Sequence, residues 1–315
     1  MSVLYLLLGL LGLLLGADMA VGGSLRLARR WNWPGWVAGM LLLALGTSLP
    51  ELFVAFASAP AYPNLALGTV FGSNAVNVGG VLGLLLIFQN RRGLPLRETG
   101  RTPLAILVVG SGLAFWAFSQ TTPNQVASFS LLFLFIVLLV MTLWKGAKSS
   151  DEDPVSAAPG GLAVSLSLAL GGFALLAGAS ELFLHGALGI AENLGWGEGV
   201  TGYIIAALGT SAPEFFTSMK AIRKGQPGAV FGNIVGSNAF NLLLVGGAIG
   251  FLADAPFLPD ALQIQLVINL VATLALIALI LPPRGDQGRR TKLGIIMGFV
   301  LLAAYLYSAW IVGMA

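Results

Sequence analysis

Ten apolar runs divide the chain, and each is close to the length of about 20 residues that a helix needs to cross a bilayer. The pattern predicts an all-α polytopic membrane protein with ten transmembrane helices. No basic residue precedes the first run, so we expect a spanning helix there rather than a cleaved signal peptide. The expected helices cover residues 3–23, 36–58, 65–88, 103–119, 126–145, 161–187, 200–220, 229–252, 261–282 and 293–312.

Two polar sequences that interrupt this apolar pattern are nearly identical. Residues 44–53 read ALGTSLPELF and residues 207–216 read ALGTSAPEFF, with eight of ten positions the same. A second pair follows, GTVFGSNAVN at 68–77 and GNIVGSNAFN at 232–241, with six identities. The chain is therefore a duplication of five helices. Because five is an odd number, the second copy enters the membrane from the opposite side, which predicts the inverted-topology repeat of many secondary transporters.

One linker-like stretch separates the two copies. Residues 145–161 read KGAKSSDEDPVSAAPGG, a polar segment of small residues with Pro and Gly. We expect a first transmembrane repeat over 1–145, a cytoplasmic linker over 146–160 and a second repeat over 161–315.

The basic residues follow the predicted helices in a regular way, since all of them come after odd-numbered helices. Cytoplasmic loops are enriched in Lys and Arg, so the odd loops are expected to be cytoplasmic and both termini to lie outside. Trp31, Trp33 and Trp36 fit an aromatic belt at the membrane interface. The 16 basic residues are Arg26, Arg29 and Arg30; Arg91, Arg92, Arg97 and Arg101; Lys145 and Lys148; Lys220, Arg223 and Lys224; Arg284, Arg289, Arg290 and Lys292.

Composition narrows the functional class. The chain is 57% hydrophobic and only 9% charged, whereas soluble domains carry about 25% charged residues. Its net charge of +3 reflects the basic residues of the predicted cytoplasmic loops, so nucleic acid is not expected as a partner. The absence of cysteine excludes thiol catalysis and Cys-based metal sites. The single His185 is interpreted as a packed or interfacial residue. The chain lacks the GxxxxGK[ST] motif of ATP-binding proteins, which disfavours an ATP-driven pump.

The first repeated motif places oxygen atoms together. Thr47 and Ser48 precede Glu51 by four and three residues, so both are its neighbours on a helix. Pro50 has no N–H, which frees the carbonyl of Gly46 and kinks the helix. Such an all-oxygen set suits hard cations such as Ca²⁺, Mg²⁺ or Na⁺. The second copy supplies Thr210, Ser211, Glu214 and the carbonyl of Gly209.

The second motif adds hydroxyls and amides. Ser73 and Asn77 are four residues apart in the third helix, and Ser237 and Asn241 match them in the eighth. Asn74 and Asn238 repeat as well but point about 100° away from this face. Gly, Ser, Thr and Pro often serve only packing in membrane helices. Packing does not need two buried glutamates, which favours a functional site.

Asp18 and Glu181 form another repeat-equivalent pair, 163 residues apart. We interpret them as hydrated charges near helix ends; a role as a gate for ions is the alternative.

On these residues the chain resembles the calcium/cation antiporter superfamily, whose prokaryotic members are sodium/calcium exchangers. Their two repeats carry GTSxPE in one helix and a GNxxGSNxxN-like run in the next, as residues 46–51, 68–77, 209–214 and 232–241 do here. The resemblance implies that the motif residues of both repeats surround four central cation sites, and that the first and sixth helices slide across this core. It further implies that the carbonyls of Ala44 and Ala207 contribute.

Two residues depart from the family pattern. Thr69 stands where the motif has Asn, and Asn241 stands where family members commonly have an acid. Two central carboxylates remain, which balance one divalent or two monovalent cations.

The sequence therefore predicts an antiporter that exchanges Ca²⁺ for Na⁺ at one shared site, with the transported ions as ligands and no cofactor. We expect a monomer embedded in the lipid bilayer of a prokaryotic inner membrane. A H⁺-coupled exchanger of Ca²⁺ or Mg²⁺ is the nearest alternative. A membrane-embedded enzyme is disfavoured because it would need a nucleophile–base pair or a set of metal-binding histidines. A passive channel is disfavoured by the Pro-broken helices.

Overall fold

The computed structural model describes residues 1–88, 101–122, 124–148, 161–193, 211–254, 256–257, 259–280 and 287–314. Within these ranges the regular structure is helical, apart from an isolated bridge residue at Pro34. The helices, with π-helical segments marked η, are α1 (Ser2–Arg30), α2 (Gly35–Val37), η1 (Ala38–Leu43), α3 (Ala44–Thr47), α4 (Leu49–Ser58), α5 (Pro63–Ala75), η2 (Val76–Leu82), α6 (Gly83–Phe88), α7 (Arg101–Phe118), α8 (Gln125–Lys148), α9 (Leu162–Asn193), α12 (Ala212–Arg223), α13 (Pro227–Ala239), η4 (Phe240–Val245), α14 (Gly246–Leu252), α15 (Pro259–Ile280) and α16 (Gln287–Met314).

The prediction of ten membrane helices is confirmed, with corrected boundaries. Helix α1 continues to Arg30 instead of ending at residue 23, and basic side chains in its last turn complement the helix dipole. Helix α8 continues to Lys148, so the first three residues of the expected linker are helical. Residues 149–160 and 194–210 lie outside the described part, and they include the start of the seventh expected helix.

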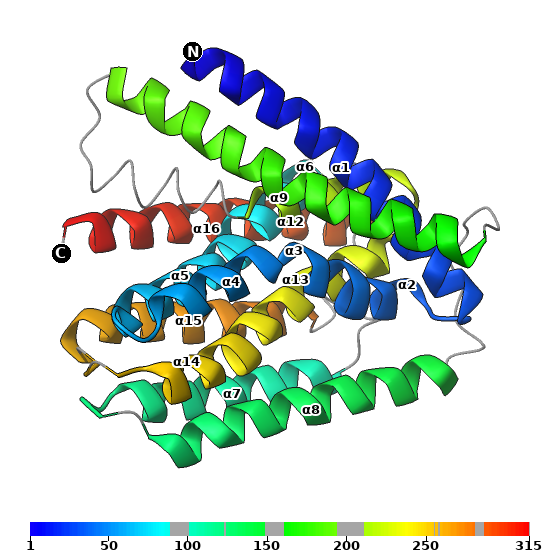
Figure 1. Ribbon diagram of the computed structural model, residues 1–315. Coiled ribbons are helices and arrows are strands. Elements are labelled where there is room, and N and C mark those ends of the chain that lie inside the picture. The colour runs from blue at the N-terminus through cyan, green and yellow to red at the C-terminus, as the bar shows by residue number, and fades with distance from the viewer. Residues whose placement is uncertain are drawn as a thin grey trace.

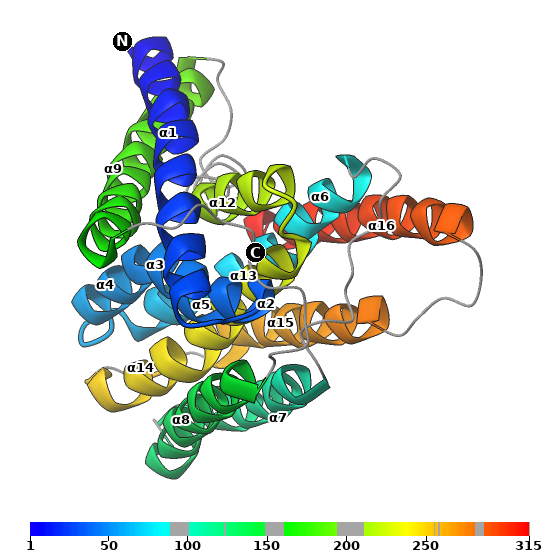
Figure 2. The same ribbon diagram turned by 90° about the vertical axis from the view of Figure 1, so that its right-hand side faces the viewer.

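Long helical pairs flank a central group of broken helices (Figures 1 and 2). Helices α1 and α9 run antiparallel along one edge, and α7 and α8 lie at the opposite edge. Glycines bring α1 and α9 into close contact, because Gly9 faces Phe183 and Gly23 faces Ala169. Small residues allow such close backbone approach in membranes, where apolar burial gives helices little reason to associate.

The centre of the molecule is formed by the third helix of each repeat. Of the residues in the most apolar stretches of Ala66–Ile87 and Pro227–Leu252, 89% and 83% are buried, whereas only 28% of those in the most apolar stretch of α1 are buried. Gly39 of η1 faces the backbone of Ala229, and Gly232 of α13 faces the carbonyl of Trp36. The two repeats are therefore interlocked around the polar motifs.

Candidate cation-binding site

The GTSxPE motifs lie where the helices break. Ser48 separates α3 from α4 with φ −93° and ψ 5°, and Ser211 precedes α12 with φ −91° and ψ 6°. Each break is followed by a proline in the first two positions of the new helix. Glu51 and Glu214 therefore lie in first turns, where the helix dipole stabilises negative charge. The kink predicted from proline is confirmed in the first repeat, between α3 and α4. In the second repeat the residues that precede Ser211 lie outside the described part.

Both carboxyl groups are buried and close to each other. Glu51 is 2% exposed and Glu214 is fully buried. Ser73 Oγ donates to Glu51 Oε1 at 3.3 Å. Ser48 Oγ donates to Glu214 Oε1 at 3.4 Å, which joins the two repeats.

Four asparagines link the two repeats reciprocally. Asn77 Nδ2 donates to Asn238 Oδ1 at 3.1 Å, and Asn241 Nδ2 donates to Asn74 Oδ1 at 3.3 Å. Asn74 and Asn238 each donate to the other's backbone carbonyl at 3.3 Å. The two asparagines that the sequence places away from the site thus hold the two that it assigns to the site.

Six buried oxygen atoms of the predicted site have no hydrogen-bond partner among the described residues. Leaving a buried acceptor unsatisfied costs about 1–3 kcal/mol, and more when it is charged. The described residues include no cluster of three or more His, Asp or Glu. Four of the six atoms belong to neutral Asn and Ser side chains. A hard cation would satisfy such a set. The atoms are Glu51 Oε2, Glu214 Oε2, Asn77 Oδ1, Asn241 Oδ1, Ser211 Oγ and Ser237 Oγ.

The other predicted ligands are partly accounted for. Thr47 Oγ1 donates to Leu43 O at 3.0 Å, which leaves its lone pairs available. The carbonyl of Ala44 accepts the Ser48 N–H at 3.1 Å, and the Thr47 hydroxyl approaches it at 3.4 Å. Ala207 and Thr210 lie outside the described residues.

Comparison with known proteins identifies the family to which this chain belongs. Residues 1–144 and 164–314 match the family described as "Sodium/calcium exchanger protein". The chain belongs to the sodium/calcium exchanger family. It is thus a member of a family of cation antiporters.

Relatives agree over nearly the whole length. Sodium/calcium exchanger MaX1 of Methanosarcina acetivorans is 26% identical, with 97% of this chain and 96% of the relative covered. Inner membrane protein YrbG of Escherichia coli is 30% identical, with 96% and 95% covered. The solved structure of the sodium–calcium exchanger NCX_Mj soaked with Na⁺ and Sr²⁺ matches with a TM-score of 0.78 and 28% identity, covering 97% of both chains. The resemblance drawn from the motifs is confirmed, as is the fold class.

π-Helical turns in this exchanger-family chain were not expected from the sequence. The segments η2 and η4 begin one residue before Asn77 and Asn241, at equivalent positions of the two repeats. π-Bulges are frequent at functional sites because they re-aim side chains within a helix. These two helices are buried on nearly all sides, so they have no single apolar face whose rotation would reveal a π-helical turn in the sequence.

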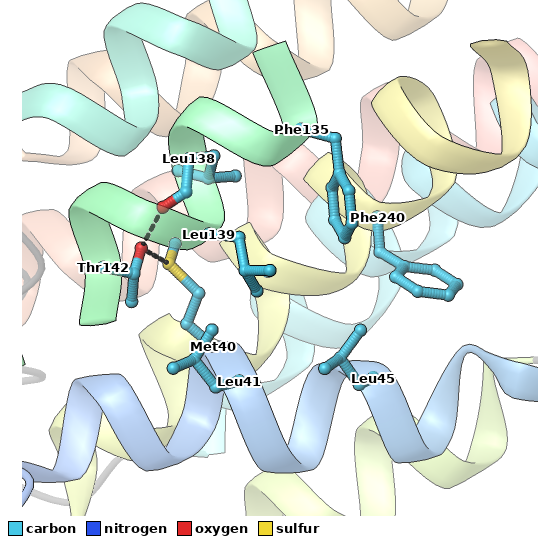
Figure 3. Close-up of a pocket in the computed structure, with 9 residues that line it drawn as sticks. Met40, Leu41, Leu45, Phe135, Leu138, Leu139, Thr142 and Phe240 are labelled. Carbon is cyan, nitrogen blue, oxygen red and sulfur yellow. Dashed lines mark hydrogen bonds between the residues drawn. The ribbon is translucent and has the colours of Figure 1, made fainter. Parts of the chain in front are cut away.

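A small pocket beside the site is apolar and has no ligand set for a cation. Figure 3 shows Met40, Leu45, Phe135 and Phe240 around it, with Thr142 at one side. The Thr142 hydroxyl contacts Leu138 O at 2.7 Å and Met40 Sδ at 3.3 Å. Phe240 lines this pocket, whereas the next residue along the chain belongs to the predicted cation site.

Asp18 does not lie near a helix end as expected, because α1 continues for twelve residues beyond it, and it makes an ion pair that the sequence did not predict. Its carboxylate is 2.7 Å from Lys220 Nζ and 3.2 Å from Lys224 Nζ, and the Asp18 side chain is 53% exposed. The lysines close the last turn of α12, so the pair ties α1 to α12. Glu181, the repeat equivalent of Asp18, is exposed on α9.

Proposed function

We propose that this family member exchanges Ca²⁺ for Na⁺ by alternating access at the central site. The observation that carries the proposal is the set of six buried oxygens without partners, to which both repeats contribute. Two carboxylates give the site a charge of −2 when both are ionised, which matches one Ca²⁺ or two Na⁺. By the symmetry of the motifs, Thr210 and the Ala207 carbonyl are proposed to complete the set beside Thr47 and the Ala44 carbonyl.

Coupling follows from competition for shared ligands. The same oxygens cannot hold Ca²⁺ and Na⁺ together, so one load must leave before the other binds. The printed names support this pair of ions, because MaX1 is a sodium/calcium exchanger and NCX_Mj structures were obtained with Na⁺ and with Ca²⁺ or Sr²⁺.

The packing supports motion of α1 and α9 as the access step. These helices form a second apolar cluster from Leu13, Ala17, Ala20, Leu176 and Ala179, which Ala212 of α12 joins. Only the last part of α1, at Val21, Leu25 and Ala28, belongs to the main core. In contrast, the motif helices are bound to each other by the reciprocal asparagine contacts. A sliding α1–α9 pair can therefore change access while the site keeps its geometry.

Uptake of ⁴⁵Ca²⁺ into proteoliposomes tests the coupling ion. An imposed Na⁺ gradient should drive saturable uptake, and unlabelled Mg²⁺ in tenfold excess should leave it nearly unchanged. Equal uptake under a pH gradient without Na⁺ would establish the H⁺-coupled alternative. This alternative is tested because Asn241 replaces an acid that family members commonly have, which changes the charge of the site. Uptake that needs no counter-ion would indicate a channel.

We further propose that both termini face the outside of a prokaryotic inner membrane and that the monomer is functional. The Asp18 ion pair supports the topology, because it brings the later part of α1 to the basic end of α12. All predicted ligands come from one chain, which supports a functional monomer. The sequence has no cysteine, so Gly313→Cys and Ser149→Cys each introduce a unique label site. An impermeant maleimide should label Gly313→Cys but not Ser149→Cys on intact cells; the reverse pattern would overturn the topology.

A further inference from the structure

Asn269 of α15 is a buried amide outside both duplicated motifs. It is 1% exposed, its Oδ1 accepts from Asn74 Nδ2 at 2.9 Å, and its Nδ2 donates to Ser111 Oγ at 3.3 Å. Helix α7, the fourth helix of the first repeat, contains no Asn or Gln between Arg101 and Phe118. This contact to the asparagine group therefore exists in one half of the molecule and breaks its internal symmetry.

The direction of the hydrogen bonds around Asn269 is set from the backbone. Thr273 Oγ1 donates to the carbonyl of Asn269 at 2.9 Å, which uses its one proton. In the 3.1 Å contact between Ser111 Oγ and Thr273 Oγ1, Ser111 must therefore be the donor. The Ser111 oxygen is then left to accept, so the Asn269 NH₂ group faces Ser111 and its Oδ1 faces Asn74.

This direction passes to the cation site. The two N–H bonds of Asn74 are used by Asn269 Oδ1 and by the carbonyl of Asn238, so Asn74 Oδ1 faces Asn241. Asn241 in turn donates to Asn74 Oδ1 and to Ser73 Oγ, both at 3.3 Å. Its own Oδ1 is left buried without a partner among the described residues.

We propose that Asn269 is a positioning residue that holds the Asn241 amide with its oxygen, not its NH₂ group, toward the cation. The inference rests on the proposed function only in taking Asn241 as a ligand. An amide reversed at residue 241 would present two donors to a positive ion. An acid at this position would present an oxygen to the cation in either orientation. Asn269 is therefore needed because this chain carries an amide, Asn241, at that position.

The test is a double-mutant cycle on cation affinity, because residues 269 and 241 make no direct contact in this relay. Dissociation constants for Ca²⁺ and for Na⁺ are measured by calorimetry on purified protein. Asn269→Leu keeps the volume but removes the acceptor for Asn74, and we expect about a tenfold weaker affinity, as for other groups that orient metal ligands. In the Asn241→Asp background the same change should not weaken binding, because a carboxylate presents an oxygen to the cation whichever way it is turned.

Equal weakening in both backgrounds would assign Asn269 to helix packing, and no weakening in the wild-type background would also overturn the proposal. Ser111→Ala provides a second variant if Asn269→Leu does not fold. It removes the acceptor for the Asn269 NH₂ group, together with the hydrogen bond to Thr273, and should give a smaller loss with the same dependence on residue 241. Wild-type protein that binds Na⁺ but not Ca²⁺ would contradict the proposed exchange and leave the cycle to be judged with Na⁺. Binding of neither ion would overturn both.

Discussion

Replacing Glu214 by glutamine should separate the two transported ions. The side chain is fully buried, its Oε1 accepts from Ser48, and its Oε2 has no partner among the described residues. Glu214→Gln keeps an amide oxygen in the site but reduces the charge from −2 to −1. The loss of attraction scales with the charge of the bound ion.

The magnitudes differ for this reason. Two unit charges about 4 Å apart in an effective dielectric of about 20 attract by roughly 4 kcal/mol, so a divalent ion loses roughly 8 kcal/mol. Residue 214 is buried with or without a bound ion, so the desolvation of its carboxylate does not enter Kd. The loss in binding free energy is therefore roughly 8 kcal/mol for Ca²⁺ and roughly 4 kcal/mol for Na⁺, and the latter is about a thousandfold in Kd.

Calorimetric titration of detergent-purified protein with Ca²⁺ and with Na⁺ measures both effects, and ⁴⁵Ca²⁺ uptake should be abolished. Glu51→Gln should behave in the same way, because its carboxyl has the equivalent place in the first repeat. Glu181→Gln is the matched control, since it removes an exposed carboxylate from α9. A Ca²⁺ Kd within about threefold of wild type, or equal losses for both ions, would refute the electrostatic account.

Three further predictions concern other parts of the molecule. Asn241→Asp should tighten Ca²⁺ binding more at high pH than at low pH, since the added acid lies close to two other carboxylates. Asn241→Ala should weaken transport without abolishing it. A Ca²⁺ affinity of Asn241→Asp that matches wild type at every pH would place residue 241 outside the ion shell. Asp18→Asn should change the turnover of ⁴⁵Ca²⁺ exchange but not the Ca²⁺ Kd, because its partner Lys220 lies outside the site; an altered Kd with unchanged turnover would contradict a role in motion. Gly232→Val should lower the melting temperature, because its side chain would meet the Trp36 carbonyl, whereas Gly112→Ala faces open space and should not; equal melting temperatures would disprove the interlock.

The duplication made most of the fold predictable, and it also singled out the residues of the candidate site. Two glutamates in matching polar runs have no packing role in an apolar helix, and every predicted ligand within the described residues lies in the central group of broken helices. The proline-induced breaks were predictable too, because a missing N–H is a local property. What the sequence could not supply depends on contacts between helices. Asn269 lies outside any repeated motif, and the partners of Asp18 are about 200 residues away in the chain.

The lengths of α1 and α9 have a consequence for the membrane itself. At about 1.5 Å per residue their 29 and 32 residues span about 44 Å and 48 Å, well beyond the roughly 30 Å of a hydrocarbon core. Helices with such positive mismatch tilt, and Figure 1 shows the pair crossing the other helices obliquely. Bilayer thickness therefore acts on the two helices whose movement is proposed to switch access. Lipids with longer acyl chains would alter the balance between the inward-open and outward-open states while leaving the ion ligands untouched.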